Sequence, residues 1–263
     1  MNIQETILAA AIQAGAAIME IYTHPETDWE VERKADNSPL TLADRRSHAV
    51  IAPILEATGI PVLSEEGIHL PYEARKDWKQ LWVVDPLDGT KEFLKRNDEF
   101  TVNIALVENG SPILGVIYVP ALYRLYWGEV GQGAWVADVD RETLAVGVAR
   151  ALPTEDLNQS HPCRVVASRS HLSEATQSFI NNLEQQYGAV ETVSAGSSLK
   201  LCLVAAGQAD VYPRLAPTME WDTAAGHAIA VAAGCEVVDA ETGQPLHYNK
   251  EDLHNPFFLV KRS

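Results

Sequence analysis

One segment gives the strongest indication of this chain's fold and chemistry, Leu81-Trp82-Val83-Val84-Asp85-Pro86-Leu87-Asp88-Gly89-Thr90. Its apolar first half predicts a strand, and Pro86 interrupts the ladder because proline has no N–H to donate. The strand therefore ends in two carboxylates, Asp85 and Asp88, with the Leu87 carbonyl between them. These oxygens suit a hard cation such as Mg²⁺. A turn that uses Asp and Gly only for turn geometry is the alternative, but it needs one Asp and not this set.

The residues directly behind this pair are suited to an anion. Gly89 and Thr90 leave backbone N–H groups free for a phosphate, especially if a helix begins there. A similar pattern recurs in Gly196-Ser197-Ser198-Leu199-Lys200, where small residues open a predicted helix and Lys200 adds a positive charge. Alone, this second motif is a weak indication of an anion site.

Two other acidic segments extend the pattern. The strand-like Leu63-Ser64 is followed by Glu65 and Glu66, which repel one another unless a cation or solvent intervenes. A solvated loop is the alternative, since charged residues usually lie outside. Farther along, Asp222 opens a helix of small residues; it is either a third metal carboxylate or an acid that complements the helix dipole. His227, inside that helix, is expected to be packed rather than to be a ligand.

Asp44 has a simpler local explanation. The sequence Thr41-Leu42-Ala43-Asp44 is a capping box that predicts a helix start, and the residues alone assign Asp44 nothing more. Pro53 is expected to kink or shorten that helix.

The remaining pattern predicts an α+β fold in two parts. A helix over 4–22 and the helix after Thr41 precede short β-like runs, and Asn109-Gly110 between two of them predicts a hairpin and an antiparallel sheet. Strands and helices then alternate beyond 146–160. We expect an N-terminal subdomain, 1–145, with the metal site, and a smaller α/β subdomain, 146–263, with the nucleotide-side contacts and Asp222. The expected strands are 61–63, 81–84, 101–107, 113–119, 133–136, 164–167, 190–193 and 209–212, and the later helices are 172–187, 198–206 and 222–233.

Composition restricts the partners. The 263 residues carry a net charge of −16, which disfavours nucleic-acid polymers and anionic membranes. A phosphorylated substrate would be repelled at long range, so a cation is expected in the site. Three widely spaced cysteines are a poor disulfide or zinc framework. No apolar run reaches the roughly 18 residues of a membrane span, and the N-terminus lacks a basic start; we therefore expect a cytoplasmic protein without stable membrane insertion.

Taken in order, these segments resemble the inositol monophosphatase-like family of lithium-sensitive phosphatases over nearly the whole chain. The two specific signatures are residues 82–90 and 221–226. The resemblance implies a layered αβαβα sandwich and two or three Mg²⁺ ions. The implied metal ligands are Glu65, Asp85, the Leu87 carbonyl, Asp88 and Asp222, with Glu66 as an outer acid. It also implies that Asp44 and Thr90 orient the attacking water, so that Asp44 has a catalytic role in addition to capping the helix. Glu65 is also implied to take part in catalysis.

Within the family, the sequence is most similar to the bacterial 3′(2′),5′-bisphosphate nucleotidases. The resemblance also allows a peripheral association with the cytoplasmic side of the inner membrane, although no anchor or basic patch in this sequence supports it. Arg214 stands where inositol-specific members tend to place an acid, and Arg suits a second phosphate. The implied substrate is the small nucleotide adenosine 3′,5′-bisphosphate, in a pathway linked to sulfate assimilation. The implied substrate-binding residues are Gly89, Thr90, Ser170, His171, Gly196, Ser197, Ser198, Lys200 and Arg214.

Three alternatives remain open at this point. An inositol-phosphate phosphatase would use the same machinery. A phosphatase with an Asp nucleophile would resemble D-x-D-G-T, but two residues separate Asp85 from Asp88 here. A metal- or nucleotide-binding protein without activity would not need a water-orienting pair beside its metal. The oligomeric state is left open.

Overall fold

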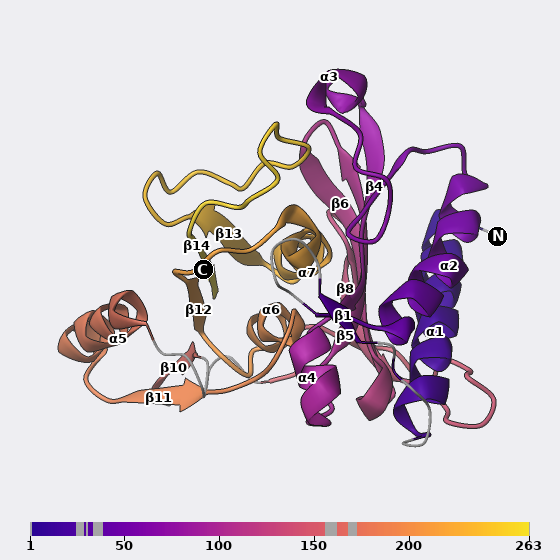
Figure 1. The fold of residues 1–263 in the computed structure, drawn as a ribbon. Coiled ribbons are helices and arrows are strands. Elements are labelled where there is room, and N and C mark those ends of the chain that lie inside the picture. Colours follow the sequence, from indigo (N-terminus) through magenta and orange to yellow (C-terminus); the bar gives the residue numbers. More distant parts are fainter. Residues whose placement is uncertain are drawn as a thin grey trace.

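The computed structural model describes residues 2–24, 29, 31–33, 39–155, 162–167 and 173–262. Its elements stack in alternating layers of helix and sheet (Figure 1). Helices α1 and α2 form the outer layer, and a large sheet separates them from α6 and α7. A smaller sheet and α5 complete the stack, so the predicted αβαβα arrangement is confirmed. The described helices are α1 (Ile3–Tyr22), α2 (Leu42–Glu56), α3 (Tyr72–Arg75), α4 (Thr90–Lys95), α5 (Glu174–Tyr187), α6 (Leu199–Ala205), α7 (Glu220–Ala232) and a 3₁₀ turn (Pro120–Leu122).

Among the described residues, the large sheet has seven strands in chain order, all paired antiparallel except β3 with β4. The Asn109-Gly110 hairpin between β5 and β6 is confirmed, and both residues have positive φ, at 50° and 78°. The strands are β3 (Val62–Ser64), β4 (Gln80–Asp88), β5 (Thr101–Glu108), β6 (Ser111–Val119), β7 (Arg124–Glu129), β8 (Gly133–Asp138) and β9 (Arg150–Ala151).

The smaller sheet mixes parallel and antiparallel pairs, and five of its strands lie in the described residues. Its parallel part is the α/β half that the sequence predicts, whereas the last two strands were not predicted. A separate pair, β1 (Glu32–Arg33) with β2 (Pro39–Leu40), is antiparallel. In spatial order the smaller sheet contains β11 (Val190–Val193), β10 (Cys163–Val166), β12 (Val211–Arg214), β14 (Phe258–Arg262) and β13 (Cys235–Asp239).

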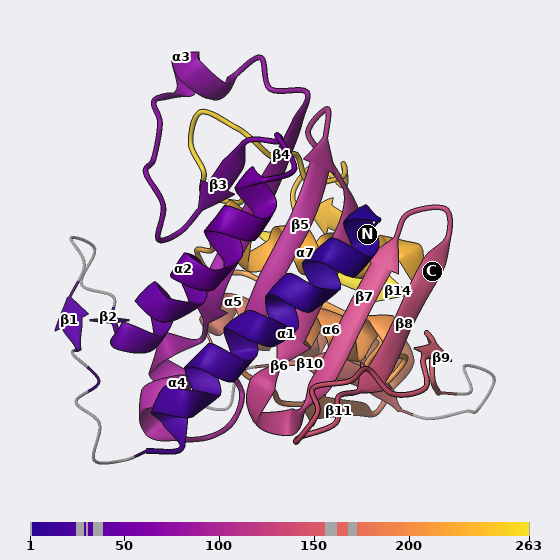
Figure 2. The same ribbon diagram turned by 90° about the vertical axis from the view of Figure 1, so that its right-hand side faces the viewer.

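Helices α1 and α2 cover one face of the large sheet (Figure 2). The predicted apolar stripe of α1 is confirmed, since Ile7, Ala11 and Ile18 are all 0% exposed. In the described part of the chain α1 also meets the length and composition test for a membrane span, so the expectation that no segment would do so was wrong. Half of the tested window is buried, and α1 packs against β5, β6 and α2, as a core helix of a soluble protein does.

The start of α2 follows the predicted capping box. The Thr41 hydroxyl accepts the Ala43 N–H at 3.2 Å, and the Asp44 carboxylate accepts the Thr41 N–H at 2.7 Å. The helix continues through Pro53 to Glu56, so it is not shortened at the proline. Its N-terminus consequently brings Asp44 to the end of β4.

Helix α7 lies between the large sheet and α6 because two glycines permit close approach. A Cβ on Gly115 of β6 would lie 2.2 Å from the Ala225 carbonyl oxygen, and one on Gly226 would lie 2.7 Å from the Leu201 side chain. This packing carries the first turn of α7 to the carboxyl end of β4. Because α7 belongs to the C-terminal segment yet packs on the N-terminal sheet, the division at residue 146 stays a prediction.

Candidate active site

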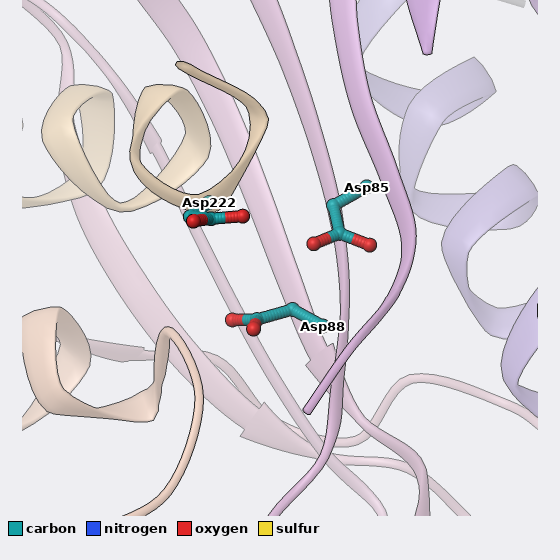
Figure 3. A group of neighbouring side chains, drawn as sticks. All are labelled: Asp85, Asp88 and Asp222. Atoms are coloured by element: carbon teal, nitrogen blue, oxygen red, sulfur yellow. The ribbon is translucent and has the colours of Figure 1, made fainter. Parts of the chain in front are cut away.

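Three carboxylates from distant segments meet where β4 ends and α7 begins. Asp85, Asp88 and Asp222 each offer one oxygen, and these oxygens lie within 4.8 Å of one another (Figure 3). The predicted convergence of Asp222 on the β4 pair is therefore observed. An all-oxygen donor set on two rigid elements fits a hard divalent cation.

A β-bulge places both β4 carboxylates on one side. Asp85 pairs with Asn103 and Asp88 with Thr101, so three steps along β4 match two along β5. Leu87 has no partner in this register, and its N–H donates to Asp85 Oδ1 at 3.0 Å. Its carbonyl oxygen lies 3.5 Å from the Thr90 hydroxyl. The bulge thus takes the backbone groups between the two acids out of the β4–β5 ladder.

Each of the three aspartates is oriented by a backbone N–H that binds one of its oxygens. Such contacts fix a carboxylate and leave its other oxygen for a metal. The donors are Leu87 N–H to Asp85 at 3.0 Å, Ser198 N–H to Asp88 at 2.6 Å and Met219 N–H to Asp222 at 2.9 Å.

The electrostatics of the cluster call for a cation. Burial raises the pKa of Asp85 well above its usual value, and the charges of Glu65, Asp88 and Asp222 raise it further. Burial and the Asp88 charge raise the pKa of Asp222 to about 8, against a smaller lowering by Arg214. The Glu65 carboxyl stands outside the group of three but hydrogen-bonds that of Asp85. Acids packed this closely are unfavourable unless protons or a metal ion neutralise them.

Asp44 and Thr90 form the predicted pair beside these acids. The Thr90 hydroxyl donates to Asp44 Oδ1 at 3.1 Å, while Oδ2 accepts the Thr41 N–H at 2.7 Å. The capping role and the pairing with Thr90 therefore use different oxygens of one side chain. Burial raises the pKa of Asp44, although the hydrogen bonds from Thr41 and Thr90 oppose this effect.

A pocket of about 590 Å³ opens beside the carboxylates, between α4, the start of α6, β12 and the start of α7. Four cationic side chains line it, although the chain as a whole carries a net charge of −16. Four acids line it as well, so these cations favour a ligand with more than one negative group once metal ions neutralise the acids. The cationic residues are Lys91, Lys95, Lys200 and Arg214.

Most of the predicted residues line this pocket. Asp44, Asp85 and Leu87 lie behind it, each at most 2% exposed. Gly196 provides close approach instead, because a Cβ there would lie 2.8 Å from the Glu99 carbonyl oxygen. Ser170 and His171 lie outside the described residues. The predicted residues on the pocket wall are Glu65, Asp88, Gly89, Thr90, Ser197, Ser198, Lys200, Arg214 and Asp222.

Sequence reasoning missed three polar residues around the site. Lys91 and Lys95 lie on one face of α4, and their spacing of four residues after Gly89-Thr90 was a usable signal. Asn103, which is 0% exposed and lies 3.5 Å from Asp88, lies in an apolar strand and left no signal of its own.

Comparison with known proteins agrees with this geometry. The model of the inositol monophosphatase family matches residues 2–257. The chain is 47% identical to the 3′(2′),5′-bisphosphate nucleotidase CysQ of Salmonella typhimurium over 97% of this chain and 98% of that protein. The corresponding Escherichia coli K12 protein is 46% identical over the same shares. The crystal structure of CysQ from Bacteroides thetaiotaomicron superposes with a TM-score of 0.87 at 51% identity, covering 99% of this chain and 98% of that one.

The fold, the two signatures and the carboxylate cluster thus agree with the match over nearly the whole length. This chain belongs to the inositol monophosphatase family.

Proposed function

We propose that this protein is a magnesium-dependent 3′(2′),5′-bisphosphate nucleotidase that hydrolyses adenosine 3′,5′-bisphosphate to AMP and phosphate, a reaction linked to sulfate assimilation. The observation that carries the proposal is the group of three aspartates beside a pocket that four cationic side chains line. The near-full-length relatives named 3′(2′),5′-bisphosphate nucleotidase support a nucleoside bisphosphate as the substrate. A cytoplasmic location without membrane insertion is part of the proposal, because the apolar face of α1 is used for packing.

The proposed ligands fit two or three Mg²⁺ ions by charge and by donor type. Bound Mg²⁺ would neutralise the carboxylates and the phosphate together and would make water a stronger nucleophile. The residues proposed to hold the ions are Glu65, Asp85, Asp88 and Asp222, together with the Leu87 carbonyl.

Asp44 and Thr90 are proposed to orient the attacking water. The Thr90 hydroxyl proton is directed to Asp44 Oδ1 at 3.1 Å, so the Thr90 oxygen can accept a hydrogen bond from water. As water attacks, Thr90 takes its proton and passes its own to Asp44, whose raised pKa favours acceptance. Attack is direct and in line, and positioning provides much of the acceleration.

The cationic wall is proposed to hold the rest of the nucleotide. Arg214 donates through Nη2 to the Pro217 carbonyl at 2.9 Å, and its buried Nε has no hydrogen-bond partner among the described atoms. A guanidinium held in this way can bind a second phosphate through two parallel hydrogen bonds. Lys200 lies on the same wall, with Nζ 3.1 Å from the Ser197 carbonyl.

A phosphate-release assay tests the proposal. The purified protein is given adenosine 3′,5′-bisphosphate, 3′-phosphoadenosine 5′-phosphosulfate, AMP or inositol 1-phosphate, each with Mg²⁺ and with chelator. We expect the bisphosphate to be hydrolysed with the highest kcat/KM, and only with Mg²⁺. Preferential hydrolysis of inositol 1-phosphate would reassign the substrate, and a trapped aspartyl-phosphate would overturn the direct attack.

A further inference from the structure

Ser198 connects the two regions that supply the aspartates. It lies at the N-cap of α6, is 2% exposed, and donates its backbone N–H to Asp88 Oδ2 at 2.6 Å. Its hydroxyl oxygen lies 2.6 Å from the same Asp88 oxygen and 2.6 Å from the Asp222 carbonyl oxygen. One buried hydroxyl therefore touches a carboxylate of β4 and the backbone of α7.

A chain of buried donors directs this hydroxyl. The Thr101 hydroxyl donates to Asn103 Oδ1 at 2.9 Å, and Asn103 Nδ2 donates to the Ser198 hydroxyl oxygen at 2.8 Å. Thr101 and Asn103 are both 0% exposed. Because the Ser198 oxygen accepts from Asn103, its single proton must serve Asp88 or the Asp222 carbonyl, both of which are acceptors. Since the Ser198 N–H already donates to Asp88, a hydroxyl proton donated to the Asp222 carbonyl lets this one residue hold both groups.

We propose that Ser198 is a positioning residue that keeps Asp88 and the first turn of α7 at the separation the metal site requires, with Asn103 and Thr101 directing its hydroxyl. The inference rests on the proposed function in taking Asp88 and Asp222 as metal ligands. The neighbouring Ser197 differs, because it is part of the pocket wall but its buried hydroxyl has no hydrogen-bond partner among the described atoms. Of these two serine hydroxyls, the one that contacts the proposed metal-ligand region is therefore that of Ser198.

The test is Mg²⁺ binding to substrate-free protein, measured by isothermal titration calorimetry. Ser198→Ala keeps the backbone N–H contact but removes the hydroxyl, and we expect its Mg²⁺ affinity to fall about tenfold. The Mg²⁺ concentration for half-maximal phosphate release should rise in parallel, whereas KM for the nucleotide at saturating Mg²⁺ should stay within about twofold of the wild-type value. Ser198→Thr, which restores the hydroxyl, should recover the affinity.

Two matched variants separate this role from general loss of stability. Thr58→Val removes a partly buried hydroxyl that accepts from the Trp82 indole at 3.0 Å, far from the pocket, and should leave Mg²⁺ affinity unchanged. Ser197→Ala removes the neighbouring hydroxyl, which has no hydrogen-bond partner among the described atoms, and should leave Mg²⁺ affinity at the wild-type value.

The outcomes distinguish the inference from the function on which it rests. Wild-type Mg²⁺ affinity in Ser198→Ala overturns the inference and leaves the nucleotidase proposal standing. If the wild-type protein binds Mg²⁺ but releases no phosphate, the proposed function is overturned. Calorimetry of Ser198→Ala would still measure the contribution of Ser198 to Mg²⁺ affinity. If Ser198→Ala does not fold, Asn103→Ala must weaken Mg²⁺ binding in the same direction, and normal binding by that variant overturns the inference.

Discussion

Asp85 and Asp222 reach the same site from regions that are built differently. The strand leading to Asp85, Leu81–Val84, is at most 1% exposed and is paired with β3 and β5 on its two sides. The first turn of α7 is instead held by polar contacts. Glu220, 0% exposed, accepts the Asn249 N–H at 2.6 Å and the Lys250 ammonium at 2.6 Å.

The difference has a physical consequence. A buried strand derives its position from a continuous apolar pattern and ladder bonds, so single changes around it are shared over many contacts. A helix start held by a few buried polar groups depends on each of them, because an unsatisfied buried group costs about 1–3 kcal/mol. We therefore expect that loss of a proposed ligand on the β4 side leaves the stability of the fold unchanged. On the α7 side we expect stability to depend on packing and on pH.

The largest effect is expected at the β4 side. Asp88→Asn removes a proposed metal ligand, and phosphate release should fall by about a thousandfold or more, since metal stabilisation of the transition state is worth several kcal/mol. The melting temperature of the metal-free variant should not fall, because one of the mutually repelling charges is gone. Differential scanning calorimetry with kinetics checks both, with the exposed Asp77→Asn as control. Full activity would remove Asp88 from the site.

Gly115→Ala disturbs the seat of α7. The new methyl would lie 2.2 Å from the Ala225 carbonyl oxygen, which is backbone and cannot rotate away. We expect a loss of about 3 kcal/mol in the free energy of unfolding, typical of overpacking, with weaker Mg²⁺ binding because Asp222 moves with α7. Urea unfolding measures the first effect and calorimetry the second. Ser111→Ala, an exposed change on the same strand, should change neither the stability nor Mg²⁺ binding. Unchanged stability in Gly115→Ala would contradict the close contact between β6 and α7.

The polar side of α7 should make stability depend on pH. Burial lowers the pKa of His227 from 6.5 to about 4, with a further lowering by the charge of His247. The unfolded chain therefore binds a proton that the folded chain rejects, so this stability is present above pH 6.5 and is lost as the pH falls toward 4.

Between pH 7.5 and pH 5 the loss amounts to about 2 kcal/mol. The His227→Gln variant can keep a hydrogen bond to the Tyr248 hydroxyl, which lies 3.0 Å from His227 Nδ1, without titrating. Urea unfolding at both pH values, with Mg²⁺ present, should show that the variant loses about 2 kcal/mol less than the wild type. Equal losses would contradict the assigned pKa.

The smallest effect belongs to the pocket rim. In the described part of the chain no ion pair involves Lys91 or Lys95, and both side chains are exposed. Lys91→Met should raise KM for the bisphosphate by about threefold at low salt, as an exposed ion pair is worth up to 1 kcal/mol. The rise in KM should shrink in high salt. Lys79→Met, which changes an exposed lysine outside the pocket wall, should leave KM unchanged. A KM that does not depend on Lys91 would exclude it from substrate contact.

The comparison also explains what the sequence could predict. The β4 strand, the Asn109-Gly110 hairpin and the Thr41 cap are local patterns, and the structure confirms them. The convergence of Asp222 with Asp85 depended on family resemblance, because no local pattern reports a contact made over more than 130 residues. Strands β13 and β14 were missed because each is a run of five residues with charged residues among the apolar ones. Asn103 was missed because its hydrogen-bond partner, Ser198, is distant in sequence.

The bulge in β4 makes one of the proposed oxygen donors, the Leu87 carbonyl, independent of side-chain identity. With a single residue between the acids, a regular ladder would still direct both carboxylates to one face, but the residue between them would stay in register with β5. The additional residue leaves the Leu87 carbonyl outside the register. Point substitution cannot delete a carbonyl, so natural variants could change this donor only by altering the length of the chain between the two acids. Relatives that have lost the phosphatase activity through this donor should therefore carry insertions or deletions between the two acids rather than substitutions.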